Sequence, residues 1–259
     1  MYEFEVDILP GHGGFDPGAV CENIRESDGN LSVALKLSYL LNLNNIKTNL
    51  SRTIDVACGN AKNIKDDINN QIKFSNSSNA DIAISIHFNS SINSSANGIE
   101  VLYTNYSNKN DNEIKLAQLV LDELINDTGM TNRGIKEISS GIGVIKHIKK
   151  PCILSENGFI SNNNDRIWCS SEEHHWILAK SHAKAICKYF NIKYKEEDEI
   201  LLKSWQKEMG ESAVDKLIEY GILSDISWKE EESLGNGLPG WLQFELFKRI
   251  YEKLKGENN

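Results

Sequence analysis

The sequence lacks a run of eighteen apolar residues, and its N-terminus lacks a basic stretch leading into an apolar segment with a small-residue cleavage site. The first absence excludes a membrane-spanning helix, and the second argues against a signal peptide. We therefore expect a soluble protein that is made in the cytoplasm.

Cysteine pairs are also missing. The chain has five cysteines (Cys21, Cys58, Cys152, Cys169 and Cys187), an odd and scattered set without a Cys-x-x-Cys motif. A disulfide framework needs an even count in a small secreted chain, so we expect reduced thiols.

The chain also has no excess of basic residues: its net charge is −9. Most of the negative charge lies in residues 196–259, which contain fifteen acidic and eight basic residues. A polyanion is held through Lys and Arg contacts to its phosphates, so nucleic acid is not the expected partner.

Residues 1–195 alternate strand-like with helix-like segments, which predicts an α/β fold with helices packed on a sheet. Strands are expected at 4–9, 47–50, 81–87, 98–103, 143–145 and 152–155. Helices are expected at 31–41, 114–125 and 172–190. Length favours one main domain, with or without a small appendage.

A charged break over residues 195–199 indicates a domain boundary, so we divide the chain into residues 1–195 and 196–259. The second part reads as a small all-helical domain, with helices at 200–209, 212–220 and 241–254. Its tryptophans, Trp205, Trp228 and Trp241, suit either a small core or a binding surface.

Two histidines and two glutamates lie after strand-like runs or at the head of a helix: His12, Glu26, His87 and Glu156. Parallel strands bring their carboxyl ends to one edge of a sheet, so these side chains are expected to meet there. Each residue taken alone is more often a core or solvated side chain. The matching positions of all four favour a shared site.

Two imidazoles and one carboxylate form a zinc set that leaves a fourth position for water. Zinc lowers the pKa of that water to about 7 and polarises a carbonyl oxygen. A second carboxylate is then needed to move the proton to the leaving nitrogen. The four residues can therefore support zinc-assisted amide hydrolysis.

A series of motifs across residues 6 to about 190 resembles the type 3 family of zinc-dependent N-acetylmuramoyl-L-alanine amidases, found in bacterial wall hydrolases and phage endolysins. The motifs are Pro10-Gly11-His12-Gly13-Gly14 with Asp16, Glu26 with Asn30-Leu31, Ser51-Arg52-Thr53 with Asp55, Ser85-Ile86-His87-Phe88-Asn89, Gly98-Ile99-Glu100-Val101, Arg133-Gly134-Ile135, and Glu156-Asn157-Gly158-Phe159 with Asp165. They stand in the family's order. Departures, such as Ser51 for the first threonine of a Thr-Arg motif, touch neither metal nor proton-transfer positions.

The resemblance implies a twisted, mostly parallel mixed sheet flanked by helices. It also implies that Zn²⁺ is held by His12, Glu26 and His87, and that Glu156 is the catalytic acid and base. The implied reaction cleaves the amide between N-acetylmuramic acid and the L-alanine of the stem peptide. Asn89 and Arg52 are candidate substrate-binding residues, the alternatives being a turn-capping amide and a surface ion pair.

The expected partner is the peptidoglycan of the bacterial cell wall, without membrane insertion. The stretch 213–223 loosely resembles helical wall-anchoring modules of the S-layer-homology kind, so residues 196–259 are expected to serve wall targeting or self-association. We expect a phage endolysin that collects in the host cytoplasm and reaches the wall after the membrane is permeabilised. The alternatives are a mother-cell-lysis amidase of sporulation, a zinc peptidase that cuts within the stem, and a non-catalytic wall-binding protein.

Overall fold

A six-stranded sheet forms the centre of the described structure. The computed structural model describes residues 2–104, 110–138 and 143–196. The strand order is β4-β1-β5-β8-β6-β7, and only the β8–β6 pair is antiparallel within it. The strands are β1 (Phe4–Pro10), β4 (Ile46–Leu50), β5 (Ile82–Asn89), β6 (Ile99–Tyr103), β7 (Asn132–Glu137) and β8 (Cys152–Phe159). The α/β fold with a mostly parallel mixed sheet is thus confirmed.

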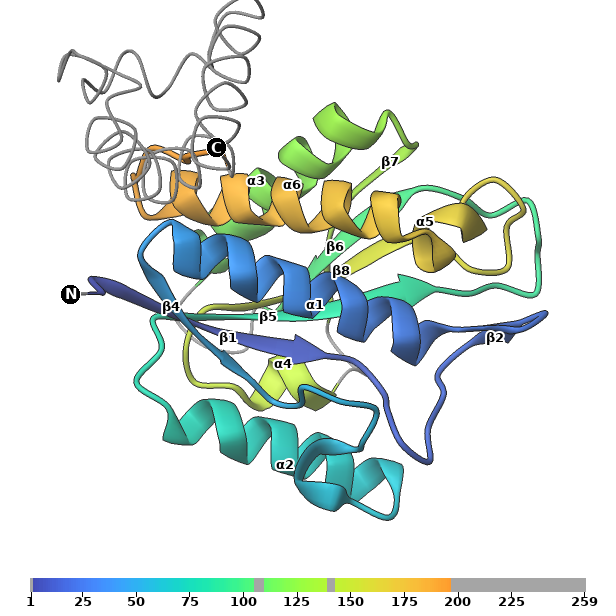
Figure 1. The fold of residues 1–259 in the computed structure, drawn as a ribbon, viewed down its shortest axis with the longest axis horizontal. Coiled ribbons are helices and arrows are strands. Elements are labelled where there is room, and N and C mark those ends of the chain that lie inside the picture. The colour runs from blue at the N-terminus through green and yellow to red at the C-terminus, as the bar shows by residue number, and fades with distance from the viewer. Residues whose placement is uncertain (1, 105–109, 139–142, 197–259) are drawn as a thin grey trace, which may run out of the picture. The chain divides into compact units, whose positions relative to one another are not determined.

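Helices cover both faces of this sheet (Figure 1). The longer ones, α1 (Glu26–Leu43), α3 (Asn110–Thr128) and α6 (Glu172–Tyr189), lie on one face, and α2 (Ile64–Ser77) and α4 (Gly143–His147) lie on the other. A short hairpin and two short helices complete the fold: β2 (Val20–Cys21), β3 (Ile24–Arg25), η1 (Cys58–Asn60) and α5 (Arg166–Ser170).

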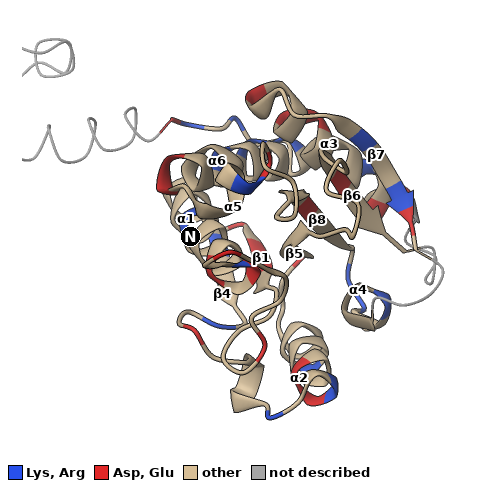
Figure 2. Cartoon of the chain, turned by 90° about the vertical axis from the view of Figure 1, so that its right-hand side faces the viewer, with Lys and Arg blue, Asp and Glu red and all other residues tan. Residues whose placement is uncertain are grey.

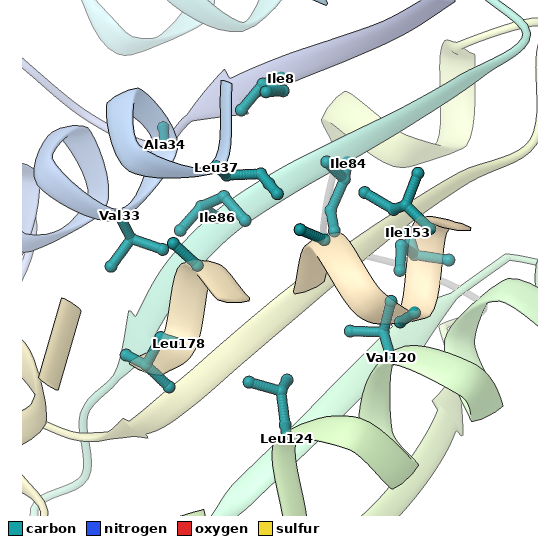
Figure 3. Packing of buried hydrophobic residues seen from close by; sticks show 14 of the residues in the cluster. Ile8, Val33, Ala34, Leu37, Ile84, Ile86, Val120, Leu124, Ile153 and Leu178 are labelled. Carbon is teal, nitrogen blue, oxygen red and sulfur yellow. The ribbon is translucent and has the colours of Figure 1, made fainter. Parts of the chain in front are cut away.

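The main core lies between the sheet and the three longer helices. Its sheet side consists of fully buried residues such as Ile84 of β5 and Ile153 of β8, and Leu37, Val120 and Leu178 contribute from the helices (Figure 3). The central strands are apolar on both faces because helices cover both, as expected for parallel strands. The site is therefore built on a rigid support.

Parallel pairing brings the ends of three strands to one edge. Pro10 pairs with Ile86, and His87 pairs with Glu156 across β5 and β8. Residues that follow β1 or end β5 and β8 are consequently neighbours, as the sequence predicted.

Two β-bulges lie near this edge. On β8, Asn157 and Gly158 together oppose the single residue Phe88 of β5, and Gly158 has a φ of 107°. On β7, Arg133 and Gly134 together oppose the single residue Glu100 of β6, and Gly134 has a φ of 84°. An extra residue reverses the alternation of side chains, so each bulge redirects the side chains of the residues after it.

One expected element is wrong. Residues 143–145 were expected as a strand, but they begin the helix α4. Val144 and Ile145 pack in a small core with residues such as Leu154, on the face that α2 also covers. An apolar run this short fits either a strand or one buried helical turn.

The other predictions concern the cysteines, membrane-spanning helices and the domain boundary. All five cysteines lie among the described residues and are free thiols. In the described part of the chain, no helix is both long and apolar enough to cross a membrane. Residues up to Tyr194 form one compact unit. The helical domain expected at 196–259 lies outside the described residues after Glu196 and stays a prediction.

Candidate metal centre

Three side chains from separate elements converge at the carboxyl edge of the sheet. His12 follows β1, Glu26 is the first residue of α1, and His87 lies near the end of β5. Oε1 of Glu26 lies 3.3 Å from Nε2 of His12 and 3.0 Å from Nδ1 of His87. One candidate ligand atom from each residue lies within 4.8 Å of the other two.

The loop before α1 approaches these side chains so closely that two positions require glycine. A Cβ on Gly11 would lie 2.1 Å from Cε1 of His87. One on Gly18 would lie 2.7 Å from both Oε2 of Glu26 and Cδ2 of His12. His12 itself has a φ of 61°, a strained conformation for a residue with a side chain. The chain thus accepts backbone strain to aim this imidazole.

Glu26 is held as a buried carboxylate. Its Oε2 accepts a hydrogen bond from the Ala19 amide at 2.9 Å, and its Oε1 accepts bonds from the Phe88 amide and from Nδ2 of Asn30. Its place at the start of α1 also exposes it to the positive end of the helix dipole. The residue is 4% exposed, so its negative charge has little contact with water.

Asp16 determines which nitrogen of His12 faces the centre. Its Oδ2 lies 2.8 Å from Nδ1 of His12, and its Oδ1 accepts the Gly18 amide at 3.0 Å. An ionised carboxylate only accepts, so Nδ1–H of His12 is the donor and Nε2 is the nitrogen that faces Glu26 and the centre.

The electrostatics fit a bound cation. Burial lowers the pKa of His12, but hydrogen bonds and charge from Glu26 and Asp16 outweigh it and raise that pKa to about 9. Burial raises the pKa of Glu26, but His12 and His87 outweigh it and bring the value well below its ordinary range. The carboxylates therefore favour positive charge between the imidazoles. Two imidazole nitrogens and one carboxylate oxygen are also the donors that zinc prefers.

Glu156 lies beside this centre on β8, paired with His87 on one side and with Glu100 of β6 on the other. Its Oε2 is buried and has no hydrogen-bond partner among the described residues. Burial raises its pKa well above the ordinary value, and the charges of Glu26 and Glu100 add to the effect. A carboxyl group in this environment holds a proton more readily than a solvated one, as an acid–base catalyst requires.

Asn89 is the last residue of β5, and its side chain binds the carboxylate of Glu100. Its Nδ2 donates to Oε1 of Glu100 at 3.1 Å, and Oε2 of Glu100 accepts from Arg133 and Lys136. Burial raises the pKa of Glu100, but Lys136 and Arg133 outweigh it and lower that pKa. Asn89 is half-buried, and its Oδ1 accepts from the Ser90 amide at 2.8 Å.

Arg52 binds the backbone of the turn that precedes His12. It is 4% exposed, and its guanidinium donates to the carbonyls of Pro10, Gly11 and Ser27 at 3.2, 2.9 and 2.9 Å. The surface ion pair considered from sequence does not describe this arginine. The structure gives it a role in fixing the turn before His12.

Asp16, Glu100 and Lys136 were not among the site residues expected from the sequence. Asp16 stands four residues after His12, and Glu100 lies inside an otherwise apolar strand, which is an available signal. Lys136 carries no such signal, because only the β7 bulge brings it toward Glu100.

Comparison with known proteins places this geometry in context. Residues 6–188 match a family model described as N-acetylmuramoyl-L-alanine amidase. A germination-specific N-acetylmuramoyl-L-alanine amidase of Bacillus subtilis is 31% identical over 190 residues, covering 71% of this chain and 78% of that protein. An endolysin of Bacillus phage SPP1 is 26% identical, covering 71% of this chain and 65% of that protein.

The fold has solved counterparts too. The crystal structure of an N-acetylmuramoyl-L-alanine amidase from Clostridium difficile 630 aligns with a TM-score of 0.65 and 31% identity. The alignment covers 74% of this chain and all of that one.

Proposed function

We infer, from the premise that this chain belongs to the N-acetylmuramoyl-L-alanine amidase family, that it uses zinc to hydrolyse the amide between N-acetylmuramic acid and L-alanine in peptidoglycan. The proposal depends on one observation: His12 and His87 both approach one carboxylate oxygen of Glu26, and Glu156 lies beside this group.

His12, Glu26 and His87 would hold the ion, through Nε2, a carboxylate oxygen and Nδ1 respectively. A bound zinc ion supplies Lewis acidity that activates water and polarises the scissile carbonyl. Asp16 keeps His12 in the tautomer that presents Nε2, and Asn30 and two backbone amides orient Glu26. The ligand set is thus oriented by the protein before any ion binds.

Glu156 would carry the proton. It takes one proton from the attacking water, whose oxygen bonds to the muramoyl carbonyl carbon. It then gives that proton to the alanine nitrogen as the carbon–nitrogen bond breaks. The products are the free carboxyl of muramic acid and a new N-terminal amine, so the atoms of one water molecule are fully accounted for.

The test is digestion of purified cell wall with the zinc-loaded full chain, followed by identification of the new ends. We expect muramic acid freed of peptide, together with new N-terminal alanine, and loss of both after zinc is removed by a chelator. New reducing sugar ends, or amines only within the stem, would exclude the amidase and support a glycosidase or the zinc peptidase. Wall binding without any new ends would support the non-catalytic alternative.

For the biological role we propose a phage endolysin, supported by the similarity to the SPP1 endolysin. The second candidate is a bacterial amidase of the spore cycle, favoured by the germination-specific relative and by a sporulation-specific B. subtilis amidase at 28% identity. Expression in a bacterial host separates them. An endolysin should accumulate without harm and lyse the cells within minutes of membrane permeabilisation. Rapid lysis of intact cells, or no lysis after permeabilisation, would count against it.

A further inference from the structure

The bulge in β7 brings two cations to one face of the sheet edge. Arg133 and Lys136 are three residues apart, so a regular strand would point them to opposite faces. The extra residue at Gly134 reverses the alternation, and both side chains reach Oε2 of Glu100. Bulges near active sites commonly re-aim a side chain in this way.

Glu100 binds both cations but does not accept hydrogen bonds from all of their N–H groups. It is one carboxylate for two positive side chains, and it is 7% exposed. Arg133 donates Nε to Glu100 and Nη1 to the Asn97 carbonyl, and its guanidinium lies 4.7 Å from the Phe159 ring centre. Within the described residues, its Nη2 has no hydrogen-bond partner. The side chains of Arg133 and Lys136 are 31% and 44% exposed, so unused N–H groups face solvent.

The cluster of Glu100, Arg133 and Lys136 lies on the β7 side of Glu156. Along the sheet the order is His12 and His87 at β1 and β5, then Glu156 on β8, Glu100 on β6 and the two cations on β7. Figure 2 shows the acidic segments of β8 and β6 followed by the basic segments of β7 at this end of the molecule. In the proposed mechanism Glu156 protonates the leaving nitrogen, and on that basis we infer that the peptide extends from Glu156 toward β6 and β7.

Spacing limits which peptide residue can arrive there. Neighbouring strands lie about 4.8 Å apart, so β7 is about 10 Å beyond β8. An extended peptide advances about 3.4 Å per residue, and the two cations reach back toward β6. The cluster therefore meets the substrate about one to three residues beyond the scissile amide.

We propose that Arg133 and Lys136, held in place by Glu100, bind a free carboxylate on the peptide part of the substrate. This rests on the proposed amidase function and adds a specificity determinant to it. The competing explanation is that the three charges only attach the edge strand β7 to the sheet. That explanation predicts an effect on stability without any preference between substrates.

The test compares two soluble muramoyl dipeptides that differ at one group, with the second residue carrying either a free backbone carboxylate or a carboxamide. The zinc-loaded full chain should show a kcat/KM at least about tenfold higher for the carboxylate, because a charge-assisted pair is lost in the amide. The difference should lie mainly in KM. Lys136→Met should bring the ratio close to one, and Lys136→Arg should restore most of it.

Lys47→Met is the matched control. Lys47 is also a half-exposed lysine on an edge strand, β4, where it pairs with Glu5 at 3.2 Å; β4 and β7 are the two opposite edges of the sheet. It should leave both kcat/KM values as in the unaltered chain. Equal kcat/KM values for the two dipeptides in the unaltered chain, or an unchanged ratio in Lys136→Met, would overturn the proposal.

If wall is cleaved at the muramoyl–alanine bond but neither dipeptide is, the pair is tested as competitive inhibitors of wall hydrolysis. The carboxylate should then inhibit at least about tenfold better, and equal inhibition would overturn the proposal. If the muramoyl–alanine bond in cell wall is not cleaved at all, the proposed amidase function itself is wrong. The two failures are therefore distinguishable.

Discussion

Asp16 is the residue on which the orientation of His12 depends, since its carboxylate accepts from Nδ1 at 2.8 Å. We expect Asp16→Asn to weaken zinc binding by about 10–100-fold, because a neutral amide no longer fixes the tautomer or raises the basicity of the ring. Competition with a chelating dye measures the affinity. Asp122→Asn, at an exposed position of α3, is the control and should bind zinc like the unaltered chain. Equal affinities in both variants would remove the role given to Asp16.

Glu156 and His87 pair across β5 and β8, yet substitutions at the two positions should have different effects on zinc binding and activity. Glu156→Gln should keep zinc but lose at least about 100-fold in kcat, since general acid–base catalysis contributes at least that much. His87→Ala should lose both zinc and activity, because it removes a ligand. Metal content and wall hydrolysis, measured on the same samples, check this. Near-full activity in Glu156→Gln would show that another group carries the proton.

At the scale of elements, the strands nearest the site were the most predictable. Central parallel strands read as apolar runs, and chemistry-bearing residues that follow such runs meet by geometry alone. This is why His12, His87 and Glu156 could be grouped before the structure was known. The assignment of Glu26 as a ligand came from family resemblance. Only the structure shows that its helix starts at the point where the β1 loop returns, with the Glu26 amide bonded to the Ala19 carbonyl.

Other elements could not be read from the sequence for physical reasons. The helix α2 is so polar that its sequence is typical of a loop, and it is fixed by Asn63, whose side chain accepts from the Asp66 amide, and by buried polar contacts. Among these, Ser75 donates to the buried carboxylate of Asp7 at 2.7 Å. Strand β7 is short, charged and interrupted by Gly134, so it lacks an apolar alternation. Both are stabilised by tertiary contacts that local pattern does not contain.

Gly98, just before β6, and Gly134, inside β7, allow the cost of backbone strain to be distinguished from the cost of a steric clash. Gly134 has a φ of 84° and no atom within 4 Å of an added Cβ, so Gly134→Ala should cost only about 1 kcal/mol of unfolding free energy. Gly98 has a φ of 99°, and an added Cβ would lie 2.2 Å from the Thr131 carbonyl oxygen, so Gly98→Ala should cost at least about 3 kcal/mol. Urea unfolding measures both. Equal losses would show that the space around each glycine does not decide its cost.

At the scale of the whole chain, the compact unit that ends at Tyr194 contains every residue placed in the site. A chain that ends after Lys195 should therefore unfold at the same urea concentration and keep its activity on soluble muramoyl peptides. Its binding to sedimented cell wall should fall by at least about tenfold if residues 196–259 supply a second point of attachment. Co-sedimentation with purified wall checks this. Unchanged sedimentation would remove the targeting role, and self-association would then be tested by comparing the two chains' masses in solution.

His182 makes the stability of the whole fold depend on pH. It is fully buried between α6 and β8, where its Nδ1–H donates to the Leu178 carbonyl and its Nε2 accepts from the Ser155 hydroxyl. Burial lowers its pKa from 6.5 to about 4, against the smaller opposing effect of the Leu178 bond. Between these values the unfolded chain binds a proton that the folded chain does not, so stability falls as the pH falls from 6.5 toward 4. From pH 7 to pH 5 this residue should remove about 2 kcal/mol.

Urea unfolding at a series of pH values isolates that contribution by difference. Carboxylates and the other histidines titrate alike in the unaltered chain and in His182→Gln, so only the variant's slope between pH 7 and pH 5 should become shallower. The comparison holds even where His182→Gln lowers stability at every pH, because the slopes and not the levels are compared. Parallel curves for His182→Gln and the unaltered chain would mean that His182 is protonated at no cost to the fold.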